Sequence, residues 1–396
     1  MSRLAELIKE LCSNGVEYSP LEKCCNILDR QRKPVTKSAR EIGKYPYYGA
    51  NGIQDYVSDY IFDGTFVLVG EDGSVITQNG NPVVTWAQGK IWVNNHAHII
   101  EETEGVLLRY LYHYIQTVDV TPLIHGNIPK LTGGDFKTIP VPIPPLPVQE
   151  EIVRILDNFT ELTAQLTAEL TARKKQYEYY RSSLLLQTSS VPMFPLKTVV
   201  KKSCSGSTPA KGNSSYYVNG DVPWLRTQDV RFNEIYEIDS FITEEAVAKT
   251  SAKWIPPNCV IIAISGATAG RCAINKIPTT TNQHCLNLEI DDSKALYKYV
   301  FYCVYSQYEE LISKKQGARG DLNSSLVLGL DIPIPYPDNV EKSLAEQQRI
   351  VDILDRFDTL CNDISSGLPA EIKARQKQYE YYRDKLLSFP RAELEV

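Results

Sequence analysis

The chain has 396 residues, more than one ordinary core accommodates, so we expect two modules of about 130 to 150 residues each with connecting helices. Hydrophobic residues make up 43% and charged residues 23%, values that are typical of globular proteins and exclude a fibre or a disordered chain. The formal net charge of −6 argues against a protein that holds nucleic acid by its own charge alone.

The start of the chain alternates apolar and charged residues at helical spacing, which predicts a short N-terminal helix within residues 1–15 and no signal peptide. Apolar runs elsewhere are far shorter than the roughly 20 residues that span a bilayer. The nine cysteines show no CxxC spacing, so they indicate neither a disulfide framework nor a zinc ribbon. We therefore expect a cytoplasmic protein without a membrane segment.

Residues 16–145 predict a mixed, β-rich module. Its apolar runs lie between Gly, Asn and Asp turns, as strands do, and an amphipathic helix follows them. Strands are expected at residues 66–70 and 83–86, and the helix near 107–115. The segment IPVPIPPLP at 139–147 is expected to form a stiff extended connector that separates the module from a long helix within residues 146–190.

Residues 191–340 predict a second β-rich module whose sequence differs strongly from the first. A strand is expected at 260–264 and one amphipathic helix near 294–312. This module also ends in a proline-rich segment, which leads to a second long helix within residues 341–396.

The two long helices repeat each other. The pattern IVxILDxF begins at Ile152 and at Ile350, and KQYEYYR begins at Lys175 and at Lys377. The offsets are 350 − 152 = 198 and 377 − 175 = 202, so the second copy carries four extra residues, about one helical turn. The extra residues coincide with SSGLP at 365–369, where Gly and Pro should break or kink the helix.

Apolar residues at three- and four-residue spacing give each long helix a seam for a partner helix. Because the first helix connects the modules, the second can bury its matching seam only by running back along the first. The predicted fold class is α+β: two mixed β-rich domains separated by an antiparallel pair of long helices, a coiled coil with an internal pseudo-two-fold repeat. A helix from Gln149 to Leu186 would be about 57 Å long, and the two chain termini are expected to be neighbours. Packing of each helix on its own module alone is the alternative.

Signatures of catalysis are missing from the sequence. Neither Gly43–Lys44 nor Gly89–Lys90 is followed by the Ser or Thr of a P-loop, and GxSxG, HExxH and the base-holding motif of amino-methyltransferases are absent. His96 and His98 alternate along an expected strand, without Cys or carboxylate partners at ligand spacing, so no metal site is predicted. We expect a non-catalytic chain with no cofactor of its own.

Polar, aromatic and basic loops in both modules suit base edges and phosphates. Asn and Gln can bond adenine in bidentate fashion and Arg can bond guanine, although each loop alone also fits a plain turn. The loops lie at residues 44–52, 78–81, 93–98 and 125–131 of the first module and at 207–217, 222–230, 265–271, 282–284 and 316–322 of the second. Basic runs at 30–44 and 197–211 would add phosphate contacts, and a partner subunit would have to supply the rest.

The repeated connectors and helix ends, with YYVNGDVPWLRTQDV at 216–230 and ISGATAG…NQH at 264–284, resemble the specificity (S) subunit of type I restriction–modification systems. The resemblance covers essentially the whole chain. It implies two target-recognition domains, each of which reads one half of a bipartite DNA site. The partners that it implies are double-stranded DNA and two methyltransferase (modification) subunits, which dock on the helices and use S-adenosylmethionine for DNA methylation. ATP-dependent restriction and translocase subunits belong to such systems too, and the sequence leaves their presence open.

By matching motifs, the resemblance implies DNA contacts in the second module by Arg226, Gln228, Arg271, Asn282, Gln283 and His284. In the first module, which departs from the YYxxGxVPW pattern, it implies contacts by Lys44, Tyr47, Tyr48, Asn51, Asn95 and His96. Compared with about 34 Å per DNA turn, the expected helix length predicts half-sites between one and two turns apart. The other functions open to such a chain are a two-module adaptor that binds proteins or glycans and a self-contained methyltransferase or nuclease.

Overall fold

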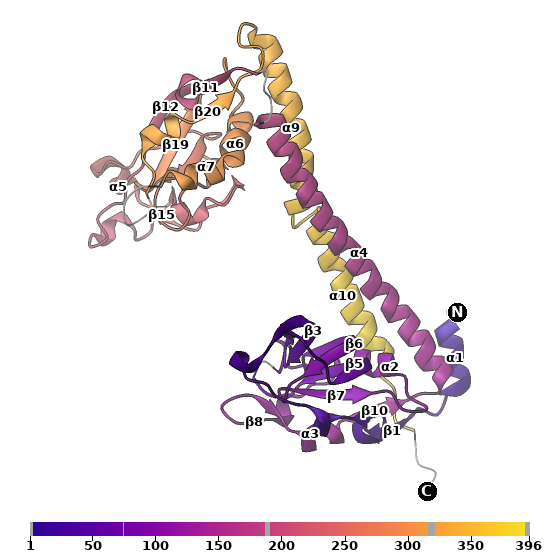
Figure 1. Cartoon of the computed structure of the whole chain (residues 1–396). Coiled ribbons are helices and arrows are strands. Elements are labelled where there is room, and N and C mark those ends of the chain that lie inside the picture. Colours follow the sequence, from indigo (N-terminus) through magenta and orange to yellow (C-terminus); the bar gives the residue numbers. More distant parts are fainter. Residues whose placement is uncertain (1–2, 74, 187–190, 316–320, 393–396) are drawn as a thin grey trace. The chain divides into compact units, whose positions relative to one another are not determined.

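The computed structural model describes residues 3–73, 75–186, 191–315 and 321–392. They form two compact units, residues 1–167 with 371–396, and residues 168–370. Each unit contains one β-rich module and one pair of helices (Figure 1). The chain is therefore α+β, with two repeated domains of mixed sheets and a long helix, as the sequence predicted.

The first module is built on a six-stranded sheet in the order β2-β7-β5-β6-β3-β4. Neighbouring strands are antiparallel except β3 and β6, which run parallel. The elements are α1 (Arg3–Leu11), β1 (Glu17–Pro20), β2 (Asn26–Ile27), β3 (Ile42–Gly49), β4 (Gly52–Val57), β5 (Phe62–Gly70), β6 (Val84–Val93), β7 (Ala97–Glu101), α2 (Leu108–Ile115), β8 (Ile124–His125), β9 (Lys130–Leu131), α3 (Gly133–Thr138) and β10 (Pro140–Ile143).

Strand β5 explains why this sheet is buried on both faces. Side chains alternate across a strand, so Val67 and Val69 face the core that includes α2, while Phe66 and Leu68 face a second apolar cluster. All four side chains are buried. An uninterrupted apolar run such as FVLV is the pattern that a strand covered on both faces requires.

The second module holds a five-stranded sheet, β12-β19-β16-β17-β14, and a three-stranded sheet, β15-β13-β18. Its elements are β11 (Met193–Pro195), β12 (Val200–Ser205), β13 (Val222–Leu225), β14 (Glu234–Ile235), β15 (Phe241–Ile242), α5 (Glu244–Lys249), β16 (Val260–Ala263), β17 (Cys272–Asn275), β18 (Thr280–Thr281), β19 (Cys285–Ile290), α6 (Tyr297–Ser306), α7 (Tyr308–Ser313), α8 (Ser324–Leu328) and β20 (Asp331–Pro333). In β16, Val260 and Ile262 face one core and Ile261 and Ala263 another.

The expectation of one helix near residues 294–312 is corrected, because the segment forms two helices, α6 and α7, that meet at Gln307. The buried Gln307 side chain donates hydrogen bonds to the carbonyls of Cys303 and Asp331, 3.3 and 3.0 Å away. An amide anchored to a neighbouring strand thus marks the end of α6.

The first long helix, α4 (Leu146–Leu185), is continuous over 40 residues. In the first unit its N-terminal part lies beside α10 (Leu368–Leu386), whose C-terminal end shares a core with Val148 and Ile152 through Leu387 (Figure 1). In the second unit the C-terminal part of α4 packs on α9 (Val340–Asn362), with Tyr177 against Phe357. Both units therefore contain an antiparallel helix pair, as the matching seams predicted.

The first proline-rich segment is extended at residues 140–143, as expected, but it belongs to the module as a strand and does not separate the module from the helix, which corrects that part of the expectation. Strand β10 pairs with β1, from Glu17 opposite Ile143 to Pro20 opposite Pro140, and β20 pairs with β11 in the same way. Proline lacks the N–H of a strand interior but fits a two-stranded edge. Helix α4 then begins at Leu146, with Pro147 in its first turn, where the missing N–H costs nothing.

The second long helix is interrupted, as SSGLP predicted, so residues 341–396 do not form one helix. Helix α9 ends at Asn362 and α10 begins at Leu368. The Asp363 carboxylate accepts hydrogen bonds from the backbone N–H and the hydroxyl of Ser365, at 2.7 and 2.6 Å. This turn closes α9 and starts α10, with Pro369 in the first turn.

The segments near the two termini lie side by side, as expected from the sequence. Val16 donates to the carbonyl of Pro390 at 2.9 Å and accepts from the N–H of Ala392 at 3.0 Å. The Tyr18 hydroxyl donates to the carbonyl of Phe389 at 2.8 Å. Among the helices of the described residues, none combines the length and the apolarity needed to cross a membrane.

Candidate nucleic-acid interface

The parallel pairing of β3 and β6 brings two of the predicted loops of the first module together. Tyr47 lies opposite Trp92 and Tyr48 opposite Val93, so residues 44–52 and 93–98 meet at one edge of the sheet. The N–H of Asn94 continues this pairing with a 3.1 Å hydrogen bond to the carbonyl of Tyr48. A loop of three residues, Asn94, Asn95 and His96, therefore follows β6 at this edge.

Asn94 shapes this loop from the inside. It is 2% exposed, its Oδ1 accepts from the N–H of His96 at 2.8 Å, and its Nδ2 donates to Gln54 Oε1 at 3.3 Å. Such a local bond from Asn to the residue two positions later holds a tight turn. Asn95 and His96 are left exposed at its tip.

The second module builds the same loop from Asn282, Gln283 and His284. Strands β13 and β18 are parallel, with Trp224 opposite Thr280 and Leu225 opposite Thr281. The N–H of Asn282 bonds the carbonyl of Leu225 at 3.0 Å, and its Oδ1 accepts from the N–H of His284 at 3.1 Å. Asn282 is buried and Gln283 is exposed. Both loops read Asn-x-His, with different exposed middle residues.

The repeat between these loops escaped the sequence analysis, which omitted Asn94 from the candidate residues. The motif NNH at 94–96 and the motif NQH at 282–284 carried the signal, but each triplet is too short to align between modules of such different sequence. By analogy, Asn282 is a loop-shaping residue, because its amide oxygen is used inside the turn.

The other predicted residues of the first module fall into two groups, buried and exposed. Tyr47 and Tyr48 are 1% and 7% exposed, so their rings belong to the core. The Tyr47 hydroxyl accepts from the N–H of Val35 at 3.0 Å, which gives it a structural role. Lys44 is exposed on β3, and Asn51 is exposed at the turn between β3 and β4. Lys44 and Asn51 join Asn95 and His96 as candidates for DNA contact.

The predicted residues of the second module lie on segments that backbone hydrogen bonds join. The N–H of Ile264 donates to the carbonyl of His284 at 2.9 Å. The N–H of Ala263 donates to the carbonyl of Arg271 at 2.9 Å, which closes the turn between these two residues. Arg226 directly follows Leu225 and is half-buried, and Gln228 is exposed two residues later. Backbone hydrogen bonds therefore join the three segments that carry these residues, and Asn282 is the member whose side chain is buried inside its loop.

Two predictions about loops and charge need correction or fall outside the structure. The loop at 316–322 lies outside the described residues except for Asp321 and Leu322, and Asp321 Oδ1 accepts from Ser265 Oγ at 2.5 Å.

In the basic run at 30–44, Arg40 pairs with Asp55 at 3.3 Å and stacks on the Tyr47 ring. Arg32 is also engaged within the module. These two guanidinium groups are not free for phosphate, whereas Arg30, Lys33, Lys37 and Lys44 are exposed.

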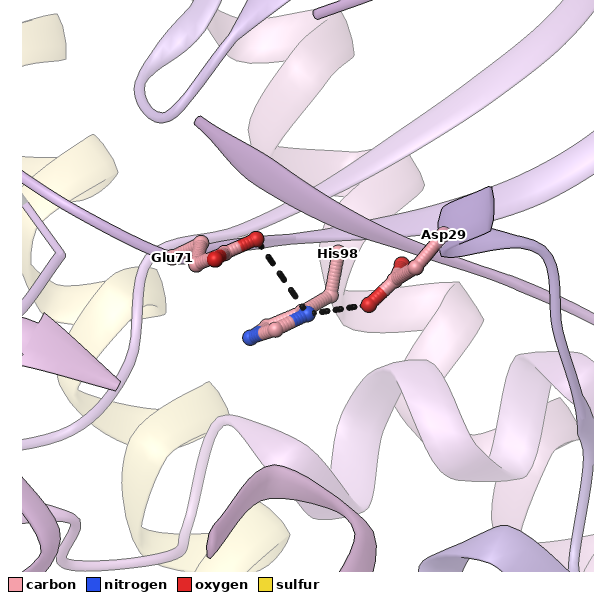
Figure 2. A group of neighbouring side chains, drawn as sticks. All are labelled: Asp29, Glu71 and His98. Atoms are coloured by element: carbon pink, nitrogen blue, oxygen red, sulfur yellow. Dashed lines mark hydrogen bonds and ion pairs between the residues drawn. The ribbon is translucent and has the colours of Figure 1, made fainter. Parts of the chain in front are cut away.

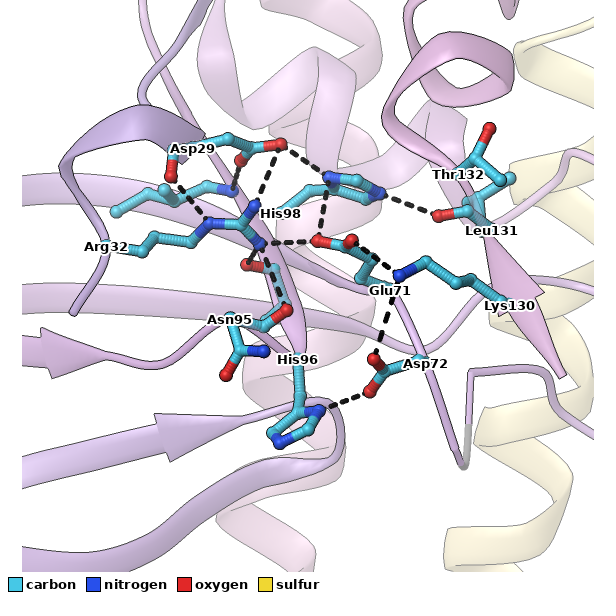
Figure 3. A network of polar contacts seen from close by, with 12 residues as sticks. Asp29, Arg32, Glu71, Asp72, Asn95, His96, His98, Lys130, Leu131 and Thr132 are labelled. Atoms are coloured by element: carbon cyan, nitrogen blue, oxygen red, sulfur yellow. Dashed lines mark hydrogen bonds and ion pairs between the residues drawn. The ribbon is translucent and has the colours of Figure 1, made fainter. Parts of the chain in front are cut away.

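Arg32 belongs to a cluster of charged side chains beside the first Asn-x-His loop, which we call the Arg32 network: Asp29, Arg32, Glu71 and His98 (Figure 3). Arg32 Nη1 lies 2.6 Å from Glu71 Oε2, and Nη2 lies 3.5 Å from Asp29 Oδ2. Burial would raise the pKa of Asp29, but the hydrogen bond from His98 and the charges of His98 and Arg32 bring that pKa below its usual range.

His98 is fully buried between two acceptors. Its Nδ1 is 2.6 Å from Asp29 Oδ2, and its Nε2 is 3.0 Å from the backbone oxygen of Leu131. Both ring nitrogens of His98 therefore face hydrogen-bond acceptors, a carboxylate on one side and a carbonyl on the other. Outside the network, Lys130 Nζ also lies 3.4 Å from Glu71 Oε1, so Glu71 faces cations from both Arg32 and Lys130.

The same residues could be mistaken for a metal centre. Atoms of Asp29, Glu71 and His98 that could ligate a metal lie within 4.8 Å of one another (Figure 2). However, the guanidinium of Arg32 already contacts both carboxylates, and both ring nitrogens of His98 already face acceptors within the module. The arrangement fits a closed ion-pair network better than a metal site.

The cysteines give no sign of thiol chemistry. All nine are free, and all but Cys204 are buried. Burial raises the pKa of Cys25 and of Cys259 to about 12 in each case, which keeps these thiols protonated. They act as small core residues.

Comparison with known proteins identifies close relatives along the whole chain. The model of the type I restriction modification DNA specificity domain matches residues 14–173 and 189–374. A Haemophilus influenzae protein assigned as a type I restriction enzyme specificity subunit is 38% identical, over 97% of this chain and 98% of its own length. The EcoR124I/EcoR124II specificity subunit of Escherichia coli is also 38% identical, over 72% of each chain.

A solved structure shares the fold. The type I restriction–modification S subunit from M. genitalium superposes with a TM-score of 0.59, over 94% of this chain and 96% of that one. The sequence identity is 14%, so this likeness concerns the fold alone.

Proposed function

Because the chain belongs to the type I restriction–modification specificity subunit family, we propose that each module reads one half of a bipartite DNA site and that the helices dock methyltransferase subunits. This chain then supplies sequence recognition without catalysis. The partner subunits supply methyl transfer from S-adenosylmethionine, and restriction and translocase subunits supply ATP-driven cleavage where they are present. The complex works on double-stranded DNA in the cytoplasm.

The pair of Asn-x-His loops is the observation that carries the bipartite proposal. The backbone bonds of the two loops correspond, with Asn94 matching Asn282 and His96 matching His284. At the exposed position between them one module carries Asn95 and the other Gln283. Both amides can form bidentate bonds to adenine, but their reach differs by one methylene group. One scaffold with two different tips is what a reader of two unlike half-sites requires.

The exposed tyrosines of the repeated KQYEYYR segment support the docking of partner subunits. Tyr179 and Tyr381 occupy the same position of the two copies and are 64% and 59% exposed. Their neighbours in the repeat, Tyr177 and Tyr379, are used inside the helix pairs and modules. An exposed aromatic side chain at an equivalent place in both copies suits two identical partners, because aromatic residues are enriched in interface cores.

The partners would also complete the electrostatics of DNA binding. The chain carries a net charge of −6, so it cannot neutralise a phosphate backbone by itself. A methyltransferase partner with a basic DNA-facing surface would supply the missing charge, while the loops of this chain select the sequence.

The test is co-expression of the chain with a methyltransferase subunit of its own system, followed by single-molecule sequencing of methylated bases. We expect one consensus with two short specified blocks around an unspecified spacer, and no methylation when the chain is expressed alone. A single continuous block would overturn the bipartite proposal. Lack of DNA retention by the complex would favour an adaptor that binds proteins or glycans, and methyl transfer by the chain alone would show that it is an enzyme.

Docking is tested by Tyr179→Ser and Tyr381→Ser, alone and combined. Each single change should weaken binding of one methyltransferase copy, and the double change should abolish the complex without unfolding the chain. Tyr236→Ser is the matched control, since Tyr236 is 60% exposed but lies in the second module. If all these variants form the complex with the methyltransferase subunits equally well, the docking site does not include Tyr179 and Tyr381.

A further inference from the structure

The tip of the first Asn-x-His loop is held by side chains from distant segments of the module. Arg32 Nη1 donates to the carbonyl of Ala97 at 2.6 Å and lies 3.5 Å from the carbonyl of Asn95 (Figure 3). The backbone N–H of Glu71 donates to the carbonyl of His96 at 2.8 Å. The carbonyls of three consecutive residues, 95–97, therefore face donors from Arg32 or Glu71.

Arg32 can hold these carbonyls because other hydrogen bonds and ion pairs fix its own side chain. Its side chain is 12% exposed, and its Nε donates to the carbonyl of Asp29 at 2.9 Å. The Glu71 and Asp29 carboxylates take the other edges of the guanidinium, and His98 holds Asp29 in turn. A planar fork with five fixed donors can bridge two carboxylates and the carbonyls of Asp29, Asn95 and Ala97, which the single ammonium group of lysine cannot.

The second module shows that an Asn-x-His loop folds without such charges. The N–H of Ile264 bonds the carbonyl of His284 as that of Glu71 bonds His96, and Leu322 bonds Ile264 as Leu131 bonds Glu71, at 2.8 Å in each module. The matching position thus carries Ile264 in one module and Glu71 in the other. The ion-pair network is an addition of the first module and is not needed for the loop backbone itself.

The exposed loop tip itself is only lightly constrained by its side chains. Among the described residues, the Asn95 side chain makes no hydrogen bond, and His96 contacts Asp72, which Lys130 approaches within 4.0 Å. The backbone is therefore the part that sets where the Asn95 amide points. A displacement of about 1 Å is enough to break a hydrogen bond to a base edge.

We propose that the Arg32 network positions the Asn95 amide for base recognition, so that Arg32 determines sequence discrimination at one half-site without touching DNA. This inference rests on the proposed function and adds a residue to it. Arg32 is a positioning residue. Its guanidinium group holds the carbonyls of Asn95 and Ala97, and its charge is neutralised by the Asp29 and Glu71 carboxylates.

The experiment measures discrimination by the complete complex of this chain with its methyltransferase partner. Methylation rates are compared on the consensus DNA and on DNA with single mismatches in either half-site. Arg32→Lys keeps the charge and removes the fork. We expect the ratio of consensus to mismatch rates to fall about ten-fold, the size of one good base contact, at one half-site. The ratio at the other half-site should not change.

The matched control is Arg30→Lys, the same substitution two residues away at an exposed position. It should leave both ratios unchanged. A second variant guards against a general effect of folding. Asn95→Ala removes the amide at an exposed site, and we expect the double variant Arg32→Lys/Asn95→Ala to discriminate no worse than Asn95→Ala alone. Non-additivity of this kind identifies two residues that act through one contact.

Several outcomes would overturn the inference. Equal loss at both half-sites would indicate a general loss of structure, and a uniform loss of binding with a shallower salt dependence would indicate a phosphate contact. Additive effects of Arg32→Lys and Asn95→Ala on discrimination would mean that the Arg32 network does not act through the Asn95 amide. If the unaltered complex shows no consensus at all, the proposed function fails; if it shows one that Arg32→Lys preserves, only the role of the network fails.

Discussion

Phe159 stacks on Tyr382, with ring centroids 5.4 Å apart and an angle of 19° between the rings. The equivalent residues of the repeat, Phe357 and Tyr180, stack at 5.3 Å and 27°. Each pair joins the LD-x-F segment of one copy to the KQYEYYR segment of the other. Each helix pair is therefore built from both copies of the repeat, which explains why these two segments are so similar while the modules differ.

Loss of either stacked phenylalanine should destabilise the unit that contains it. For Phe159→Ala and for Phe357→Ala we expect about 2 kcal/mol, less than for a fully buried ring because both side chains are half-buried. Denaturant unfolding of the purified variants measures the change. Phe159→Leu should recover at least half of it, and a change below the error of the measurement for Phe159→Ala would show that the stacking contributes nothing.

Buried glutamines in α4 and α9 should also be important for the stability of the folded chain. Gln149 Oε1 accepts from the N–H of Leu107 at 2.9 Å, and Gln347 Oε1 accepts from the N–H of Leu296 at the same distance. Both side chains are fully buried. Alanine at either site leaves buried backbone groups without partners, so we expect a loss of about 3 kcal/mol. Gln348→Ala, beside Gln347 but exposed, is the control and should change stability little.

The Arg32 network predicts a specific dependence of stability on pH. The pKa of Asp29 is lower in the folded protein than its ordinary value of 3.8. The stabilisation from its ionised form is therefore complete above that value and is lost as the pH falls through the folded-state pKa. Asp29→Asn should cost about 3 kcal/mol near neutral pH, because it leaves His98 and Arg32 with one carboxylate fewer.

Thermal unfolding of Asp29→Asn and of the unaltered chain across acidic pH tests this linkage. The difference in stability between them should shrink as the pH decreases below 3.8. A difference that stays constant, or grows, in acid would mean that the Asp29 carboxylate is not ionised in the folded protein. Asp59→Asn, at an exposed residue, should not show the trend.

Substitution of the exposed loop tips should affect one half-site at a time. For Gln283→Ala in the second module and Asn95→Ala in the first, we expect discrimination to fall about ten-fold at different half-sites. The readout is the consensus of methylated sites in cells that express each variant complex. Relaxation of the same half-site by both variants would contradict the assignment of one module to each half.

Local sequence patterns were sufficient for the repeat, the helix pairs and the helix break. IVxILDxF and KQYEYYR are long enough to align, and a seam of apolar residues has few ways to be buried, so the antiparallel pairing followed from connectivity. The interruption at Gly367 and Pro369 also followed from local chemistry, because neither residue suits a helix interior.

The loop architecture depended on tertiary structure. The relation between Asn94 and Asn282 appears only when β3 lies parallel to β6 and β13 to β18, pairings between strands far apart in the chain. For the same reason the sequence could not show that Tyr47 is buried or that Arg32 is neutralised by Glu71. Helix seams repeat at short intervals along one segment, whereas a sheet edge gathers residues from several segments, and only the folded chain decides which of them meet.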